Sequence, residues 1–164
     1  MSALTKFAIL AIATASFTFA ADATAPRRIV ISIPDRKLVL LEGDKPIKIY
    51  DVAVGKAATP TPQGEFQIVN RIPNPTWYWP GKIVGPGKDN PLGSRWMGLN
   101  APGLGIHGTN APQSVGKAAS HGCIRMRKHD IEELFNLVDV GTVVELAGER
   151  PQILAAVLAD SVTG

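Results

Sequence analysis

The fold of this chain is restricted most by a succession of short apolar segments separated by turn residues. "RRIVISI" at residues 27–33 and "KLVLLEG" at residues 37–43 flank the turn sequence "PDRK". Segments of this length, rich in Val, Ile and Leu and bounded by Pro, Asp or Gly, are typical of β-strands that pair as a hairpin. The beginning of the folded region is therefore predicted to be a β-hairpin.

The same pattern continues along the chain. Residues 46–55 alternate Ile47 and Ile49 with Lys48 and Tyr50, which is the period of a strand. Further strands are expected at residues 65–69, 95–100, 103–109 and 141–146, with a turn at 101–103. No internal repeat and no linker divides this pattern, so a single β-rich domain is predicted.

Helical periodicity is limited to a few short segments. Residues 130–138 place Ile131, Leu134, Phe135 and Val138 on one face, and the acidic residues at their start suit the helix dipole. A short helix is expected at residues 112–116, and a frayed one at residues 153–158 of the tail.

Residues 71–92 are dense in Pro, Gly and aromatic residues and are predicted to form a long loop. Long loops in compact domains are usually functional or disordered, and the aromatic run Trp77, Tyr78 and Trp79 favours order. Two interpretations stay open: a hydrophobic plug on the sheet, or a flap that covers a substrate.

The first residues have the pattern of an export signal. Lys6 precedes an apolar run at residues 7–20, and small residues follow at the positions a signal peptidase requires. A retained anchor would need ~20 apolar residues. We therefore expect a signal peptide at residues 1–23, cleaved near 20–23, a domain at 24–148 and a tail at 149–164. No later stretch is apolar enough to span a membrane, and the signal predicts that the protein is exported.

The charge distribution argues against nucleic acid as a partner. The chain has 17 Lys and Arg against 14 Asp and Glu, and the two signs are interspersed. A nucleic-acid-binding protein usually concentrates its basic residues in a patch or along a helix. The small positive excess would suit an anionic wall polymer, but it carries little weight.

Cys123 is the only cysteine, and it lies in "SHGCIRM". Cysteines of exported proteins normally pair as disulfides, so a single one is a buried apolar residue, a surface accident, half of an intermolecular bridge, or a reactive group. A catalytic thiol needs a base or a positive environment. His121 lies two residues earlier, on the same side of an extended segment. His107 lies further back in "GIHGT", where the flanking glycines allow close approach.

Other residues of this motif suit binding or stabilisation of a reacting carbonyl. Gly122 leaves the neighbouring main-chain N–H groups unobstructed for an oxyanion, and Ser120 is a further candidate. Arg125 can hold a substrate carboxylate or lower the pKa of the thiol, or it is simply a solvated surface residue.

A metal site is the main chemical alternative. His107, His121 and Cys123 form an acceptable zinc ligand set with water in the fourth position. No further Asp, Glu or His lies at ligand-like spacing, and His129 is interpreted as a surface residue at a helix start. No second cysteine is present to resolve a redox reaction. We therefore expect neither a metal nor a cofactor.

The segment "GIHGTNAPQSVGKAASHGCIRM", with "DIEELF" and "GTVVEL" after it, resembles the catalytic domain of the L,D-transpeptidases of the YkuD type. The resemblance extends over nearly the whole region after the signal and includes the Thr61-Pro62 and Gly64 turn. Lys128 departs from it, since many members carry an asparagine there that starts the helix. The resemblance implies a β-sandwich or barrel of mixed, mostly antiparallel strands with a few short helices.

The resemblance also implies acyl transfer on peptidoglycan stem peptides and, together with the export signal, a location in the periplasm or cell wall. Cys123 would attack the carbonyl that joins the third residue to the terminal D-alanine, and an amine would take the resulting thioester. His107 would be the general base, oriented by the carbonyl of Gly108, while His121 would support an oxyanion site near Gly122. Substrate or oxyanion contacts are expected from Gly122, Ser120, Arg125, Trp77, Tyr78 and Trp79.

The sequence leaves three classes of function open. The first is a transpeptidase whose acceptor is another stem peptide or a lysine of an outer-membrane lipoprotein. The second is a hydrolase, such as an L,D-carboxypeptidase, in which water replaces the amine at the same site. The third is a non-catalytic wall-binding module, which the intact "HGT" and "SHGC" segments disfavour.

Overall fold

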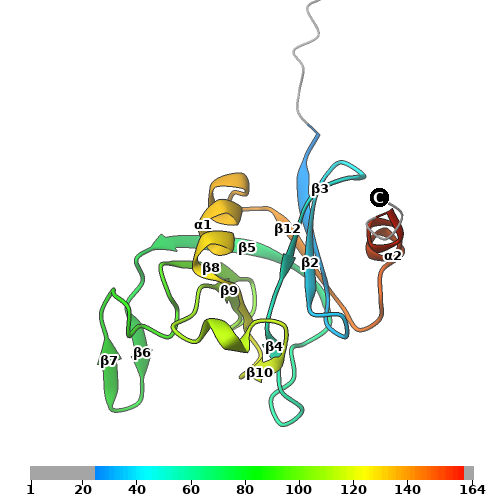
Figure 1. Cartoon of the computed structure of the whole chain (residues 1–164). Coiled ribbons are helices and arrows are strands. Elements are labelled where there is room, and N and C mark those ends of the chain that lie inside the picture. Colours follow the sequence, from blue (N-terminus) through cyan, green and yellow to red (C-terminus); the bar gives the residue numbers. More distant parts are fainter. Residues whose placement is uncertain (1–24, 161–164) are drawn as a thin grey trace, which may run out of the picture.

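A curled, mixed sheet of eight strands forms the body of the protein (Figure 1). The computed structural model describes residues 25–160, so the expected signal peptide lies outside the described residues. Within the sheet the strand order is β11-β9-β8-β5-β12-β1-β2-β3, and only the pairs β1–β12 and β11–β9 are parallel. The predicted β-rich, mostly antiparallel fold is therefore confirmed.

The strands β1 (Arg27–Ser32) and β2 (Lys37–Glu42) form the predicted hairpin, and both of their faces are buried. Alternate side chains, such as Ile29 and Leu38, enter the main core between the sheet and the helix α1 (Lys128–Leu137). Those that point the other way are covered by α2 (Gln152–Asp160), whose Leu154 is fully buried. The tail is therefore part of a second core, and the helix expected at residues 153–158 is present as α2.

The strand β3 (Lys45–Asp51) lies at the edge of the sheet. A register irregularity opposite Leu40 and Leu41 interrupts its pairing with β2. The side chain of Tyr50 is buried, whereas Ile49 is 40% exposed. The hydroxyl of Tyr50 remains satisfied because it donates to Glu133 at 2.9 Å. The buried face of this strand therefore carries Tyr50 rather than Ile49, which the simple alternation of polarity does not indicate.

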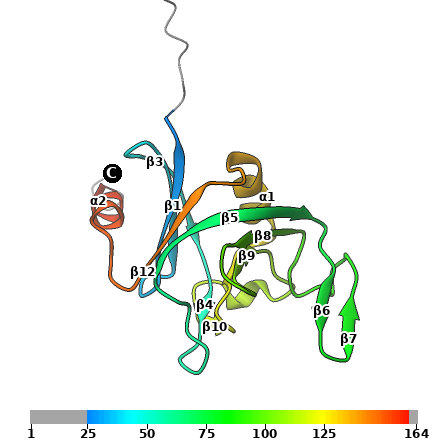
Figure 2. The same ribbon diagram turned by 180° about the vertical axis from the view of Figure 1, so that it is seen from behind.

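The strand β5 (Gly64–Pro73) joins the two halves of the sheet (Figure 2). Its first residues pair with β12 (Val143–Ala147), and the rest pair with β8 (Arg95–Leu99) after an irregularity that follows Ile68. The strand is longer than the predicted segment 65–69 because Arg71, Ile72 and Pro73 continue its pairing.

The predicted loop at 71–92 contains a second hairpin, and this is a correction. The strands β6 (Trp77–Trp79) and β7 (Lys82–Val84) pair and project from the body of the molecule (Figure 1). The buried side chain of Asn90 closes the segment, since its amide donates to Pro75 O at 2.7 Å and its carbonyl accepts from Leu92 N at 2.8 Å. The side chains of Tyr78 and Trp79 are 71% and 57% exposed. A hydrophobic plug on the sheet is therefore the wrong interpretation.

The predicted central helix is α1 (Lys128–Leu137), which buries Ile131 and Leu134 against the sheet. Its N-cap, Arg127, supplies no side-chain hydrogen bond, and Lys128 instead pairs with Glu132 one turn later at 2.8 Å. His129 is exposed at the helix start, as predicted.

Three short elements complete the structure. They are the 3-10 turn η1 (Pro112–Ser114) and the strands β4 (Val54–Gly55) and β10 (Ala118–Ser120), which pair in parallel. Within residues 25–160, neither helix is long and apolar enough to cross a bilayer.

Candidate functional site

His107 ends the strand β9 (Gly105–His107) in the interior of the molecule. β9 pairs with β8 on one side and with β11 (Ile124–Arg125) on the other. Trp96 of β8 is the register partner of His107. Its indole stacks on the imidazole, with ring centroids 5.6 Å apart. A Cβ at position 105 would lie 2.6 Å from this indole, so Gly105 is required for the packing. The ring of His107 is thereby held in one place.

The protonation of the His107 ring follows from its hydrogen bond. Its Nδ1 lies 2.6 Å from the main-chain oxygen of Gly108. A carbonyl oxygen only accepts, so Nδ1 carries the proton and Nε2 keeps a free lone pair. Burial lowers the pKa of His107 to about 4, with a smaller contribution from the charge of Arg125, although the Gly108 carbonyl opposes the shift. At neutral pH the ring is therefore an uncharged base.

Cys123 lies directly before β11, beside the start of β9. The chain reaches it through Gly122, whose φ of +116° is a conformation that side chains other than glycine rarely adopt. The thiol is partly exposed, and its Sγ donates to Gly103 O at 3.1 Å. Burial raises the pKa of Cys123, while the main-chain N–H of Gly105 and the charge of Arg125 oppose the shift. The resting group is therefore a neutral thiol.

Ser120 fixes the turn that carries the thiol. Its buried hydroxyl donates to Cys123 O at 2.5 Å and accepts from Gly122 N at 3.1 Å. Both contacts lie inside the turn, so the structure gives Ser120 a positioning role. The second contact occupies the N–H of Gly122. Among the main-chain N–H groups near Gly122 that were expected to face an oxyanion, this one is therefore not available, whereas that of Cys123 remains a candidate.

Two threonines that the sequence did not single out as site residues hold the same turn from outside. Thr61 is buried, and its hydroxyl donates to Gly122 O at 2.8 Å and accepts from Gly55 N at 2.8 Å. Thr59 donates to Ser120 O at 3.1 Å. The signal that could have located them is the "TPTP" turn, whose rigid prolines present hydroxyl groups at fixed positions.

His121 and the projecting hairpin approach each other at the open side of the site. Along residues 121–126, the even-numbered residues are buried and the odd-numbered ones are partly or fully exposed. This alternation agrees with the prediction that His121 and Cys123 share a side. The ring of His121 lies 6.4 Å from that of Trp79, which in turn stacks on Trp77 at 5.8 Å. Tyr78 alternates to the other face of the hairpin, so it is not brought to His121.

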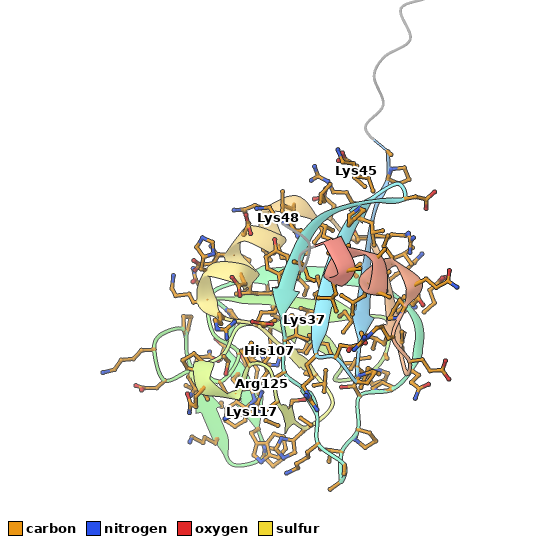
Figure 3. The ribbon with its side chains drawn as sticks, turned by 45° about the vertical axis from the view of Figure 1, so that its right-hand side comes forward. Lys37, Lys45, Lys48, His107, Lys117 and Arg125 are labelled. Atoms are coloured by element: carbon orange, nitrogen blue, oxygen red, sulfur yellow. The ribbon has the colours of Figure 1, made fainter. Side chains whose placement is uncertain are left out.

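Arg125 lies between His107 and residue 53. Its Cα is in register with that of His107, and its main chain exchanges hydrogen bonds of 2.8 and 3.0 Å with Ala53. Figure 3 labels Arg125 next to His107, its partner in the sheet. Lys117 lies on the other side of the segment 53–54, where its main-chain oxygen accepts from Val54 N at 3.1 Å. The residue is half-buried, so it is not the freely solvated arginine that was the alternative interpretation.

The zinc alternative finds no support in this geometry. Within residues 25–160, no group of three or more His, Cys, Asp or Glu side chains is arranged to hold a metal ion. Nδ1 of His107 is engaged by Gly108, and the thiol of Cys123 by Gly103. What the arrangement offers instead is a partly exposed thiol just before β11 and a buried neutral base on the neighbouring strand β9, which suits nucleophilic attack on a carbonyl.

Comparisons with known proteins point in the same direction. Residues 26–146 match the model of the L,D-transpeptidase catalytic domain family. The putative L,D-transpeptidase YkuD of Bacillus licheniformis is 46% identical over 75% of this chain and 67% of its own length. The putative L,D-transpeptidase YqjB of Bacillus subtilis is 40% identical over 74% of this chain and 72% of its own length.

Solved structures agree in fold. The catalytic domain of an Enterococcus faecium L,D-transpeptidase superposes with a TM-score of 0.62 at 26% identity, over 76% of this chain and 99% of that domain. An L,D-transpeptidase from Mycobacterium tuberculosis superposes with a TM-score of 0.63 at 19% identity, over 74% of this chain and 57% of that one. This chain thus spans little more than half of the mycobacterial structure.

Proposed function

Because the chain belongs to the L,D-transpeptidase catalytic domain family, we propose that it is a cysteine-dependent acyltransferase acting on peptidoglycan stem peptides. The observation that carries the proposal is the fixed tautomer of His107. With Nδ1–H on Gly108 O, only Nε2 is free to take a proton, and β9 holds it beside the strand that follows Cys123.

The first half-reaction breaks the bond between the third residue of the stem and its terminal D-alanine. Sγ of Cys123 attacks the carbonyl carbon while its proton passes to Nε2 of His107. The imidazolium then gives this proton to the D-alanine nitrogen as the C–N bond breaks. D-Alanine leaves with a free amine, and the acyl group remains on Cys123 as a thioester.

The developing oxyanion needs hydrogen-bond donors at the open side of the turn. The main-chain N–H of Cys123 is one candidate, since Ser120 and Thr61 hold the turn in which it lies. His121 is the second, because it is exposed on the same side of the turn. It therefore supports the oxyanion, and His107 is the base.

The second half-reaction delivers the acyl group to an acceptor. An amine of a second stem peptide gives a cross-link between two third-position residues, and a lysine of an outer-membrane lipoprotein gives attachment of that protein. Water gives hydrolysis at the same site. The hairpin β6–β7 favours transfer, because Trp79 beside His121 can cover a bound donor and limit access of water. Such substrates lie outside the cytoplasm, so the protein acts in the periplasm or cell wall.

Incubation with a muropeptide that carries a tetrapeptide stem tests the proposal. Mass spectrometry of the intact protein should detect a thioester adduct on Cys123 with release of D-alanine, with or without a chelator. Cys123→Ala should abolish the adduct, and His107→Ala should slow its formation by the ~10²–10⁴ of a lost general base. His121→Ala should cost less, which provides the matched comparison.

The products separate the alternatives. Cross-linked dimers indicate transfer, and a tripeptide alone indicates hydrolysis. Wild-type protein that forms no adduct and releases no D-alanine would contradict the proposal and favour a binding module. Inhibition by the chelator would instead support the zinc site.

A further inference from the structure

The structure holds one arginine at the site whose charge has no acidic partner. Five other arginines are paired with carboxylates, in the pairs Arg27–Glu42, Arg28–Asp44, Arg71–Asp139, Arg127–Asp51 and Arg150–Asp35. Among the ion pairs of residues 25–160, none includes Arg125, although it lies between the fully buried residues Ile124 and Met126. A half-buried guanidinium loses part of its hydration, and it recovers this energy best from an anion that supplies paired oxygens.

The side chain of Arg125 projects from the same face of the sheet as that of His107. Residues in register on neighbouring strands share a face, and Arg125 is in register with His107. His107 is in turn in register with Trp96, and their rings do stack. Cys123 lies two residues before Arg125, and both are on the less buried side of the segment. Arg125 is therefore directed to the side on which thiol and imidazole act.

We infer that Arg125 binds the free carboxylate of the terminal D-alanine of the donor peptide, which makes a terminal carboxylate a requirement for the reaction. The inference rests on the proposed function. The D-alanine nitrogen must come within hydrogen-bond reach of His107, because it receives the proton of the imidazolium. The carboxylate carbon of this residue lies about 2.5 Å from that nitrogen by standard bond lengths. Neighbouring strands are about 4.8 Å apart, so a cation beside His107 has the reach to meet this carboxylate.

The consequence is specificity for the last bond of a stem. A guanidinium binds a carboxylate through two parallel hydrogen bonds, which a terminal amide cannot reproduce. A pentapeptide stem also lacks a carboxylate on its fourth residue, because that carboxyl group forms the peptide bond to the fifth. Arg125 therefore selects tetrapeptide stems by charge, independently of the side chains that precede the scissile bond.

Two donors that differ only in their last group test this role. Tetrapeptide stems ending in D-alanine or in D-alaninamide are supplied to wild-type protein, and kcat/KM is measured from the amine released. Wild type should prefer the carboxylate by about 10²-fold, the effect typical of a lost buried charge pair. Arg125→Gln should remove this preference by slowing only the carboxylate donor, and Arg125→Lys should restore part of it.

Lys117→Gln is the matched control. Lys117 carries the same charge near Arg125, but its side chain is exposed, so its removal should leave the preference within about threefold. If Arg125→Gln slows both donors equally, Arg125 acts through the thiol or the fold, and the inference is wrong. If wild type turns over both donors equally, the inference is wrong while the proposed function stands.

A second measurement does not depend on the natural substrate. Iodoacetate and iodoacetamide alkylate a thiolate by the same displacement of iodide, but only the first carries a carboxylate. The ratio of their rate constants at Cys123 should fall about tenfold in Arg125→Gln and remain unchanged in Lys117→Gln. Because any change in the thiol pKa affects both reagents alike, the ratio reports the cation alone. The ratio also decides the case in which neither peptide donor reacts and the proposed function fails. An unchanged ratio would then refute anion binding by Arg125, whereas a lower ratio in Arg125→Gln would support anion binding alone.

Discussion

Acidification from pH 7 to pH 4.5 should destabilise the protein through a single buried side chain. His107 has its pKa lowered by burial from 6.5 to about 4. In the unfolded chain the same imidazole takes up a proton near pH 6.5. Between these two values the unfolded state binds more protons than the folded state, so stability is complete above pH 6.5 and is lost as the pH falls toward 4.

The size of the loss follows from the two pKa values. For one group that titrates at 6.5 when unfolded and at about 4 when folded, the free energy of unfolding decreases by about 2 kcal/mol between pH 7 and pH 4.5. This is a large part of the 5–15 kcal/mol that is typical of a domain. Four paired carboxyl groups also have lowered pKa values, namely Asp35, Asp51, Glu132 and Glu133. Their contribution is lost mainly below their ordinary values of 3.8 and 4.5, so the interval from 4.5 to 6.5 isolates His107.

Urea unfolding followed by tryptophan fluorescence at half-unit steps of pH measures this dependence. Wild type should show the slope, and His107→Gln should be less stable at pH 7 but nearly independent of pH in the same interval. His121→Gln should keep the wild-type slope, because that ring is exposed. An equal slope in His107→Gln and wild type would refute the reasoning, as would a wild-type stability that is flat from pH 7 to 4.5.

Three further substitutions probe the parts that surround the reacting groups. Thr61→Val should leave Gly122 O and Gly55 N without the partner that Thr61 provides, which lowers the free energy of unfolding by about 1–3 kcal/mol and kcat by tenfold or more. Thr61→Ser should restore most of both. Urea unfolding measures the first effect and D-alanine release the second. Trp79→Ala should change stability by no more than about 0.5 kcal/mol because the ring is exposed, yet raise the donor KM; a large fall in Tm would show that the hairpin belongs to the core. Leu154→Ala should cost about 2–5 kcal/mol at an unchanged KM, since α2 packs on the face of the sheet away from the site.

The sequence predicted where the main strands and helices lie from their side-chain patterns. It did not show which distant element covers a buried face or where pairing is irregular. The tail helix is an example, because it was expected at residues 153–158, but a run of consecutive apolar residues does not tell that Leu154 packs on the outer face of β1 and β2. Tyr50 is another, since the irregularity opposite Leu40 and Leu41 is a property of the pairing and leaves no trace in either strand alone.

At the site, the residue types were predictable and their partners were not. The local pattern around Cys123 identified the thiol and both histidines as candidates, and only the resemblance favoured His107 over His121 as the base. The hydrogen bond from Thr61 to Gly122 depends on two segments about sixty residues apart meeting at one turn. Composition carries no information about such a contact. The hairpin β6–β7 was likewise not predicted, because the proline and glycine content of residues 71–92 favours a loop.

The site keeps the thiol of Cys123 and the imidazole of His107 uncharged at rest, and this bears on how a reactive thiol stays intact before a substrate arrives. Burial raises the pKa of Cys123 and lowers that of His107, so proton transfer from thiol to imidazole is unfavourable before a substrate binds. A neutral thiol is a poor nucleophile and a poor target for oxidants, because the thiolate is the reactive form. In the proposed reaction the substrate changes this balance, since attack on its carbonyl creates an oxyanion at the same moment as an imidazolium. Donors near Cys123 stabilise the first charge, and the Gly108 carbonyl stabilises the second. Under this mechanism the thiol becomes a nucleophile only in the presence of the group that it attacks, and in the free protein it is protected by the same burial that disfavours its ionisation.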